Sequence, residues 1–424
     1  MSTAEATVRI EVLCTGDELL TGLTADTNSP FFMSKLLEQL GQRVQREVVV
    51  GDVRADLVAA IRAASERSDV VLVSGGLGPT ADDLTAECAA VAQGVPLVES
   101  GPALEALKAR FARRGMTVTA NNLKQAMVPA GSEVVVNQVG SAPMFIQSLA
   151  EATLFYVPGV PREYRHLVEH EVLPRLRARV EGEVGRTHRA FKLLKTIGLP
   201  ESHLDQLVAP IALEHPQVIF GFRTHAPENH LKLLAEADSA AGAEAALRAA
   251  EAKSRAVLAP WLFGEEGDRF SDSVGRLLVA QGRSVAVAES CTGGRLSALL
   301  TEPAGASAYF LGGAVTYQES GKQRWARVKP QTLAAHGAVS REVAVEMAEG
   351  IRAEHAADFG LAVTGFAGPT GGTEADPVGT VYCALAGRGE TLCERQVFAG
   401  DRERVREFAA HHALDLLRKR LEGR

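Results

Sequence analysis

The chain has 424 residues, 46% hydrophobic and 23% charged, a composition typical of a globular protein with two or three domains. A net charge of −7 and the lack of any basic block argue against nucleic acid as a partner. No leader peptide opens the chain and no apolar stretch approaches the roughly 18 residues of a membrane helix, so we expect a cytoplasmic protein without membrane contact. The five cysteines are scattered and never spaced as CxxC, which argues against disulfides and a zinc site.

The first part of the chain alternates between apolar strand-like runs and amphipathic helix-like runs. Residues 1–7 form a short polar lead. Strands are predicted at 8–13, 43–50 and 70–73, and helices at 30–40 and 55–66. This alternation is typical of a buried parallel sheet with helices on its faces.

The strand at 70–73 runs into a glycine-rich segment, SGGLGPTADDLT, at residues 74–85. Glycines at the carboxyl end of a sheet strand let backbone amides hold a phosphate, and adjacent carboxylates at a helix start can hold a divalent cation. Plain capping of the following helix by Thr80 or Asp82 is the alternative. We favour a functional loop because capping alone would not require three glycines.

The next segments carry weaker signals. A helix is predicted at 100–114, a loop at 121–122, a strand-to-helix turn at 158–161 with a helix at 162–170, and a linker at 173–185. The order strand, helix, strand, strand, helix follows at 190–196, 202–213, 218–223, 230–236 and 240–256. His225 and His230 are predicted to be polar surface residues rather than metal ligands.

After a second boundary at 260–268 and a helix at 270–281, an apolar run at 285–288 leads into ESCTGG and a further amphipathic helix. Free amide groups at a helix start, next to glycines, can cradle an anion. The alternative is that Ser290 or Thr292 simply caps the helix.

Ser307, Tyr317 and Lys322 follow in that order, and no histidine lies between residues 231 and 335. A serine nucleophile with a lysine base is therefore one interpretation, and a turn role for Ser307 is the other. Lysine must lose its proton to act as a base, so its pKa must fall from about 10.4. Burial by Phe310, Leu311 and Val315 could lower it.

The remaining residues predict a helix to Ala353 capped by Ser340, a strand at 360–363 and a second glycine-rich loop at 364–373. Arg404 stands at a helix start, where its guanidinium would suit a phosphate or carboxylate, although an ordinary surface arginine is the alternative.

Five segments of this last part, ESCTGG, GASAYFLGGAVTYQESGK, GAVS, VTGFAGPTGG and PVGTVY, occur in order over about 160 residues and resemble the CinA C-terminal domain. The stand-alone relatives of that domain, called PncC, are nicotinamide mononucleotide deamidases. The resemblance implies Ser307 as nucleophile and Lys322 as base, without any cofactor. The other site residues that it implies are Tyr317, Thr364, Ser290, Thr292, Gly293, Gly305 and Arg404. Two positions depart from the family pattern, since Glu319 stands for a common Asn and Asp376 for a common Lys.

Residues 8 to about 170, with TGDELLTG, DTN, GGLGPTADDLT and VPGVPREY, resemble the N-terminal domain of CinA, which shares its fold with molybdopterin-binding proteins. In that family the domain is described as a metal-dependent ADP-ribose pyrophosphatase. The resemblance implies a divalent metal (Mg, Mn or Co), with K⁺ also compatible. The implied metal ligands are Asp82 and Asp83, then Glu18 and Asp17, and the implied phosphate-binding residues are Gly75, Gly76, Gly78, Thr80 and Asn28.

These resemblances predict an α/β protein with three domains: a molybdopterin-binding-like three-layer domain (1–172), a small KH-like α+β domain (173–260) and a CinA-type α/β/α domain (261–424). The KH-like resemblance rests on the order of elements alone, because residues 198–201 supply no GxxG clamp for nucleic acid. The expected function is a bifunctional hydrolase that acts on nicotinamide mononucleotide and ADP-ribose. The resemblance also implies a homodimer. A non-catalytic pterin-, nucleotide- or partner-binding protein linked to competence or DNA damage is the alternative.

Overall fold

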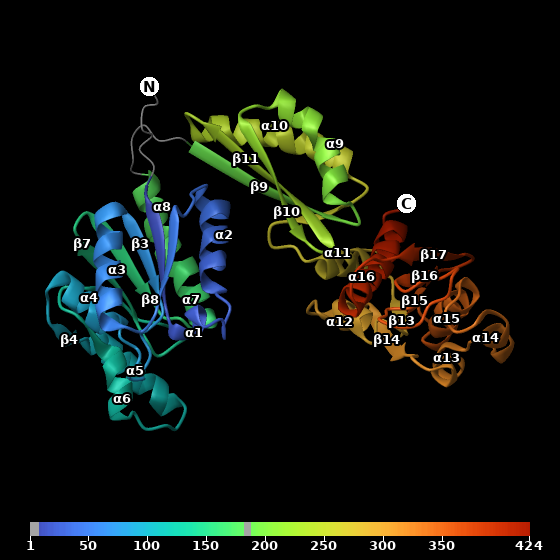
Figure 1. The fold of residues 1–424 in the computed structure, drawn as a ribbon, viewed down its shortest axis with the longest axis horizontal. Coiled ribbons are helices and arrows are strands. Elements are labelled where there is room, and N and C mark those ends of the chain that lie inside the picture. The colour runs from blue at the N-terminus through green and yellow to red at the C-terminus, as the bar shows by residue number, and fades with distance from the viewer. Residues whose placement is uncertain (1–7, 182–187) are drawn as a thin grey trace. The chain divides into compact units, whose positions relative to one another are not determined.

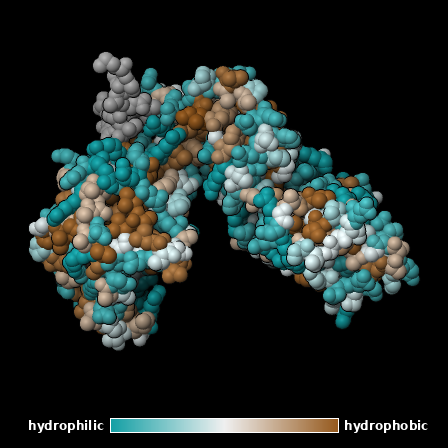
Figure 2. All heavy atoms as spheres, viewed as in Figure 1, coloured by the Kyte–Doolittle hydropathy of each residue, from teal (hydrophilic) through white to brown (hydrophobic). Residues whose placement is uncertain are grey.

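The computed structural model describes residues 8–181 and 188–424, so the polar lead and residues 182–185 of the predicted linker lie outside it. The chain divides into two compact units, Met1–Phe191 with Leu234–Leu247 and Lys192–Leu233 with Arg248–Arg424. Figure 1 shows separate sheets with their own helices along the chain. On the face drawn in Figure 2, hydrophobic residues form separate patches among hydrophilic ones. No helix in the described ranges is long and apolar enough to cross a membrane.

The N-terminal domain has a mixed six-stranded sheet in the order β2-β1-β3-β8-β7-β6. The first four strands in that order are parallel, as the alternating pattern predicts, and β7 and β6 are antiparallel additions. The strands are β1 (Ile10–Thr15), β2 (Arg46–Val50), β3 (Val70–Ser74), β6 (Glu133–Val135), β7 (Met144–Leu149) and β8 (Ala152–Val157), with a separate pair β4 (Leu97–Glu99) and β5 (Met127–Pro129).

Helices cover both faces of this sheet, which gives the predicted three layers (Figure 1). Alternate residues of β3 belong to different cores: Val70 and Leu72 lie in one, Val71 and Val73 in the other. The helices are α1 (Asp17–Leu20), α2 (Asn28–Leu40), α3 (Arg54–Arg67), α4 (Thr85–Gln93), α5 (Gly101–Arg113), α6 (Ala120–Leu123), α7 (Pro161–Leu167) and α8 (Leu173–Glu181).

Two predicted irregular segments of this domain are helical. Residues 121–122 lie in α6, whose first turn is closed by a capping box between Thr119 and Asn122. Residues 173–181 form α8 rather than a linker, because Leu173, Leu176 and Val180 are buried in the domain core. The charged residues that alternate with these three apolar ones led to the interpretation of this segment as a linker. The N-terminal domain therefore extends past the predicted boundary at 172.

The middle segment has a four-stranded sheet in the order β10-β11-β9-β12. Its elements are β9 (His188–Ile197), α9 (Glu201–Glu214), β10 (Val218–His225), β11 (Glu228–Ala237), α10 (Ala240–Leu258) and β12 (Leu262–Glu265). Since β12 is part of this sheet, the sheet extends beyond the predicted boundary at 260. His230 is buried and bonds Glu228 at 2.7 Å, so its predicted surface position is wrong.

The C-terminal domain has a five-stranded sheet in the order β14-β13-β15-β16-β17, in which β14, β13 and β15 are parallel. Apolar cores on both faces give the predicted α/β/α layers. Its elements are α11 (Phe270–Ala280), β13 (Val285–Glu289), α12 (Arg295–Thr301), β14 (Phe310–Val315), α13 (Glu319–Ala326), α14 (Pro330–His336), α15 (Arg341–Glu354), β15 (Phe359–Gly365), β16 (Thr380–Ala386), β17 (Thr391–Val397) and α16 (Arg402–Leu421). Ser340 caps α15 as predicted, by accepting a hydrogen bond from Val343 N.

Candidate functional sites

The C-terminal site forms where the parallel strands β13, β14 and β15 end. Ser290 follows β13, and its backbone N–H donates to Val363 O of β15 at 2.9 Å. Thr316 follows β14, and its N–H donates to Glu289 O at 2.6 Å. Because carboxyl ends of parallel strands share one edge of a sheet, the loops after them meet there.

Lys322 and Ser290 form a buried pair at this edge. Lys322 lies in α13 and is 1% exposed. Its ammonium group donates to Ser290 Oγ at 2.9 Å and to Thr316 O at 2.8 Å. A serine hydroxyl in hydrogen-bond contact with a lysine amine is the arrangement that a serine–lysine hydrolase requires.

Burial lowers the pKa of Lys322 from its ordinary value to about 8, against opposing effects of Cys291 and Glu319. This is the direction that the sequence analysis expects. The cause is different, since Leu311 and Val315 are 46% and 54% exposed and cannot supply that burial. Cys291, also buried, has its pKa raised to about 11 and carries no thiolate at neutral pH.

The predicted anion cradle at the start of α12 is filled by the protein itself. The carboxylate of Glu289 accepts hydrogen bonds from the backbone N–H groups of Gly294, Leu296 and Ser297 at 2.8–3.1 Å, and from Ser297 Oγ at 2.6 Å. Neither Ser290 nor Thr292 caps this helix, whose N-cap is Gly294. A phosphate would meet a carboxylate there instead of free amides, so the cradle prediction is wrong.

Ser307 and Gly305 lie at the opposite end of the sheet. Both belong to a short 3₁₀ turn that precedes β14, and Tyr309 O, next to it, accepts from Val285 N at the start of β13. Lys322 follows β14, a strand roughly 17 Å long by its rise per residue. The structure therefore does not bring Ser307 together with Lys322 within one chain, and Ser290 stands beside the amine.

An arginine that sequence reasoning missed reaches the C-terminal site. Arg402, at the start of α16, donates to Gly368 O at 2.8 Å and to the Tyr317 hydroxyl at 3.1 Å. The predicted Arg404 instead stacks over the Phe408 ring, 4.7 Å from its centroid. Arg406 donates to Cys291 O and Thr292 O. The absence of a side chain at Gly293 makes space for this guanidinium, since a Cβ there would lie 2.9 Å from it.

Thr364, Thr292 and Asp376 were also singled out from the sequence, and the structure gives each a different environment. Thr364 is buried at the end of β15 and donates to Ala338 O at 2.8 Å. The hydroxyl of buried Thr292 has no partner within the described residues. Asp376 accepts hydrogen bonds from Tyr382 and Arg395, which hold the glycine-rich loop before β16 against the sheet. Its carboxylate is thereby neutralised by Arg395 rather than left facing a substrate phosphate.

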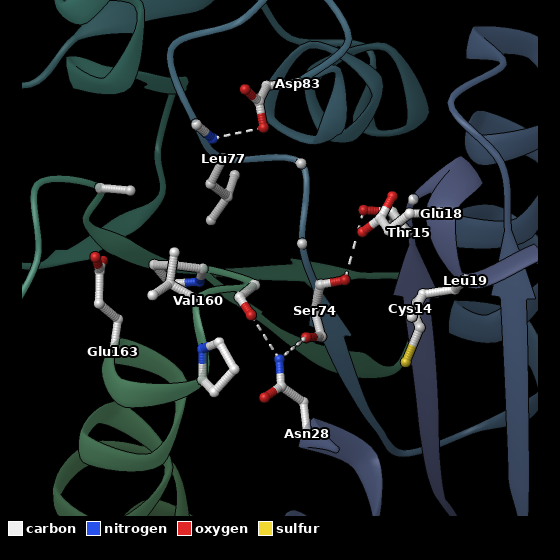
Figure 3. Close-up of a pocket in the computed structure, with 18 of the residues that line it drawn as sticks. Cys14, Thr15, Glu18, Leu19, Asn28, Ser74, Leu77, Asp83, Val160 and Glu163 are labelled. Atoms are coloured by element: carbon white, nitrogen blue, oxygen red, sulfur yellow. Dashed lines mark hydrogen bonds between the residues drawn. The ribbon is translucent and has the colours of Figure 1, made fainter. Parts of the chain in front are cut away.

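The N-terminal site is a pocket of about 430 Å³ at the carboxyl ends of β1, β3 and β8. The strand order reverses between β1 and β3, the point where open α/β sheets usually bind ligands. Figure 3 shows side chains of β1, β3, α2 and α7 around it. Of the predicted residues, Gly75, Gly76, Gly78, Asn28, Glu18, Asp82 and Asp83 line the pocket.

Asp83 closes its own loop instead of offering a free carboxylate. Its oxygens accept from Gly78 N and Thr80 N at 2.8 Å each, and from the Thr80 hydroxyl. Two of these three donors belong to Thr80, so its backbone N–H and its hydroxyl are both engaged with Asp83. A Cβ on Gly78 would lie 2.5 Å from Asp83, which explains the glycine by packing.

Several carboxylates line the pocket, and one of them, Asp52, was not predicted from the sequence. Glu18, Asp52 and Asp82 line the pocket. Asp17 is bonded to Asp52, because the backbone N–H of each residue donates to the carboxylate of the other at 3.1 Å. Burial, with the charges of Asp17, Glu18 and Asp82, raises the pKa of Asp52. Their hard oxygen donors are of the kind that a divalent cation prefers. Among the described residues, however, these three carboxylates do not form a group with all ligand atoms within 4.8 Å of one another. Asp52 follows β2, and only the fold places it beside Glu18.

A second group of potential ligands lies nearby. Cys14, Asp26 and Glu47 have ligand atoms within 4.8 Å of one another. Burial raises the pKa of the Cys14 thiol to about 12, however, and its sulfur contacts Ser29 Oγ at 2.9 Å. The thiol is therefore protonated at neutral pH in the metal-free protein.

Comparison with known sequence families assigns all three domains. Residues 11–178 match the probable molybdopterin binding domain, residues 191–264 the damage-inducible protein CinA KH domain, and residues 268–421 the CinA C-terminal domain. These matches agree with the predicted order of domains and with the observed sheets.

Full-length relatives cover nearly the whole chain. A CinA-like protein of Myxococcus xanthus (strain DK1622) is 54% identical over 415 residues, 98% of each chain, and one from Anaeromyxobacter sp. (strain Fw109-5) is 47% identical over 414 residues, 97% of this chain and 98% of the relative. The crystal structure of the competence damage-inducible protein A of Klebsiella pneumoniae is 42% identical and covers 36% of this chain and 94% of its own, with a TM-score of 0.35. The chain therefore belongs to the CinA family.

Proposed function

We propose that this protein is a bifunctional hydrolase: its C-terminal domain deamidates nicotinamide mononucleotide, and its N-terminal domain cleaves ADP-ribose with a divalent metal. The observation that carries the deamidase is the 2.9 Å hydrogen bond between Lys322 Nζ and Ser290 Oγ in a buried site. The substrate follows from the family resemblance. Ser290, rather than Ser307, is the proposed nucleophile because it alone of the two meets a base.

The deamidation proceeds in two stages at this pair. Neutral Lys322 takes the proton of Ser290 Oγ as that oxygen attacks the carboxamide carbon. The lysine then passes the proton to the departing nitrogen, which leaves as ammonia while Ser290 holds the acyl group. Water, deprotonated by the same amine, hydrolyses this ester to nicotinate mononucleotide and restores the serine. Thr316 O orients the amine through its own 2.8 Å bond.

Arg402 is the proposed residue for the substrate phosphate. Its guanidinium and the Tyr317 hydroxyl stand together at the rim, joined at 3.1 Å, and Tyr317 is 55% exposed. A guanidinium can offer two donors to phosphate oxygens. Arg404 is occupied by Phe408 and takes no part.

Ammonia release from nicotinamide mononucleotide tests this proposal. Ser290→Ala should lower kcat by at least about a thousandfold, as removal of a nucleophile does, with an unchanged melting temperature. Ser307→Ala is the matched control, an exposed serine in the same domain, and should stay within about twofold of wild type. Loss of activity in Ser307→Ala with retention in Ser290→Ala would reverse the assignment.

For the N-terminal domain, the pocket lined by Gly75, Gly76 and a carboxylate group supports a diphosphate substrate. Glu18, Asp52 and Asp82 would hold the divalent cation, which when bound offsets the negative charge of the diphosphate. The backbone around Gly75 and Gly76 faces the pocket and lets a phosphate approach closely.

Hydrolysis of ADP-ribose should therefore stop in excess chelator and return with added Mg²⁺ or Mn²⁺, while deamidation continues unchanged. Asp52→Asn and Asp82→Asn should each lower the diphosphatase rate by about a hundredfold or more. Asp56→Asn, exposed on α3, is the control and should keep the wild-type rate. Full turnover in chelator would remove the metal from this proposal.

A further inference from the structure

Cys14, Asp26 and Glu47 form a compact group in the N-terminal domain that neither proposed reaction uses. One ligand atom from each residue, the thiol sulfur or a carboxylate oxygen, lies within 4.8 Å of the other two. Cys14 lies near the end of β1, Asp26 precedes α2, and Glu47 belongs to β2. The spacing of the cysteines argued against a zinc site, but these ligands come from three elements that only the fold brings together.

The pairing of β1 with β2 explains why Glu47 reaches this group. Glu47 is the register partner of Val12, and Val12 and Cys14 belong to the core that contains residues of α2. Partners in neighbouring strands project from the same face of a sheet, so Glu47 projects toward α2 as well. Because β2 is the edge strand, Glu47 is exposed and a small ion can reach the group from that side.

Asp26 is held with one carboxylate oxygen turned toward the thiol. Its Oδ1 accepts hydrogen bonds from Asn28 N at 2.8 Å and from Ser29 N at 3.2 Å, at the start of α2. Its Oδ2 lies 3.7 Å from Cys14 Sγ, and Ser29 Oγ contacts the same sulfur at 2.9 Å. One oxygen therefore anchors the start of the helix, and the other is positioned as a ligand beside the sulfur.

The two carboxyl groups meet here without a basic side chain. Burial acts to raise the pKa of Asp26, but hydrogen bonds from Ser29 and the Asn28 backbone outweigh it, and the pKa is lowered. Burial raises the pKa of Glu47, and its hydrogen bond to Asp26 adds to the rise. The two carboxyls therefore share a proton, and neither is ion-paired with a basic side chain among the described residues. A metal ion can take the place of a proton shared in this way.

A buried phenol beside the group has no partner. Tyr164, in α7, is fully buried, and its hydroxyl oxygen makes no hydrogen bond within the part of the chain that the structure describes. Burial raises the pKa of this hydroxyl, and the charges that add to the rise are those of Cys14, Asp26 and Glu47. The phenol therefore lies next to all three ligands. A buried hydroxyl left unpaired costs free energy, and a water bound to a metal ion at the group would satisfy it.

We propose that Cys14, Asp26 and Glu47 bind a thiophilic divalent cation of the zinc class, with a water beside Tyr164 as the fourth ligand. A sulfur ligand with two carboxylates suits Zn²⁺ or Co²⁺, whereas Mg²⁺ takes oxygen ligands. The incoming cation replaces the thiol proton and the proton shared by the two carboxyls, and both protons pass to solvent.

The bound cation would tie the end of β1, the start of α2 and the edge strand β2 together. The site differs from the carboxylates Glu18, Asp52 and Asp82 in its sulfur ligand and in the elements that supply it. It is independent of both proposed hydrolase activities, so failure of either activity leaves it standing.

Cobalt titration of the full-length protein tests the site, because a cobalt–thiolate bond gives an intense charge-transfer absorption that oxygen ligands do not. Excess Mg²⁺ occupies the carboxylates at the pocket, and a phosphine replaces thiol reductants. We expect Co²⁺ to produce the sulfur band in the presence of Mg²⁺, and Zn²⁺ to remove the band by displacing Co²⁺.

Two pairs of variants locate the ligands. Cys14→Ala should lose the sulfur band, and Cys393→Ala, which removes the least buried cysteine, should keep it. Glu47→Gln changes an exposed side chain and should fold as the wild type does, while its Zn²⁺ binding weakens by about tenfold or more. Glu66→Gln, exposed on α3, is the matched control and should bind Zn²⁺ as the wild type does.

A folded wild-type protein without a sulfur band would overturn the site, and so would a band of equal strength in Cys14→Ala. If Cys14→Ala fails to fold, Glu47→Gln decides the question. Wild-type affinity for Zn²⁺ in Glu47→Gln would overturn the three-ligand site.

Discussion

Burial of Lys322 changes the fraction of its amine that is neutral, and thus able to act as a base, at pH 7. At an ordinary pKa near 10.5 fewer than about one lysine in a thousand is neutral at pH 7, whereas at about 8 the fraction is roughly one in ten. The acceptors described for this amine, Ser290 Oγ and Thr316 O, are uncharged oxygens rather than carboxylates, which would favour the charged amine more strongly. In the proposed mechanism this neutral fraction supplies the base for Ser290 at physiological pH.

The deamidase rate should therefore follow the titration of Lys322. We expect kcat/KM to rise about tenfold per pH unit up to about 8 and to level off above it, because only the neutral amine accepts the serine proton. Ammonia release measured from pH 6 to 9.5 checks this profile. A flat profile, or one that falls between pH 7 and 8, would contradict a lysine base.

The same shift also affects stability. Between the folded pKa of about 8 and the ordinary value of 10.5, the unfolded chain binds more protons than the folded one. The free energy of unfolding should accordingly rise with pH across this window and be lowest below about 8. Lys322→Met, which cannot titrate, should lack that rise in denaturant titrations. An identical rise in the variant would assign it to other groups.

At the scale of elements, α12 depends on a carboxylate from the strand before it. Glu289 is the last residue of β13, fully buried, and it satisfies the first amides of a helix of seven residues. Strand, turn and helix are thereby locked around Ser290. Gly293 and Gly294, both with positive φ, allow the chain to turn between β13 and α12. The hydrogen bonds of Glu289 hold this turn in place.

Replacing Glu289 with Gln should destabilise the domain by about 2–3 kcal/mol, since an amide NH₂ would face backbone donors and several charge-assisted bonds would be lost. Thermal unfolding measures the effect, and deamidation at 25 °C should fall as Ser290 loses its fixed position. Glu390→Gln, exposed between β16 and β17, is the control. Wild-type stability in Glu289→Gln would show that the α12 amides find other partners.

Across the whole molecule, the C-terminal domain includes residues before its family match. Arg418 is fully buried in α16 and donates to Pro260 O at 2.9 Å and to Leu262 O at 3.4 Å. Phe263 packs edge-on against Phe270 in the same core, to which Ile197 also belongs. A fragment cut at 264 would leave a buried guanidinium with unfilled donors and a cavity at Phe263.

A fragment of residues 264–424 should therefore be less stable than one of residues 188–424 by about 3 kcal/mol or more. Denaturant unfolding of both fragments measures the difference. The longer fragment should deamidate nicotinamide mononucleotide at the full-length rate, and Asp82→Asn in the full chain should leave that rate within about twofold. Equal stability of the two fragments would show that the 260–263 segment is dispensable.

The sequence by itself determined the alternation of strands and helices in this fold. The apolar runs at 70–73 and 285–288 predicted buried strands, which are observed as β3 and β13, and the glycines after them predicted loops. Ser340 at its cap and α15 behind it followed from local hydrogen bonding. The predicted family and domain order were confirmed, because long ordered motifs retain information that periodicity lacks.

Only the tertiary structure decided which side chains meet. Ser290 and Ser307 look equivalent along the chain, but β14 separates Ser307 from Lys322 and a sheet edge joins Lys322 to Ser290. Asp83, an expected metal ligand, and Glu289, which the sequence did not single out, both accept hydrogen bonds from backbone amides of their own loops. The sequence shows which chemical groups are present at each position. Their hydrogen-bond partners depend on how strands that are distant in the sequence pack together, and the site consists of those partners.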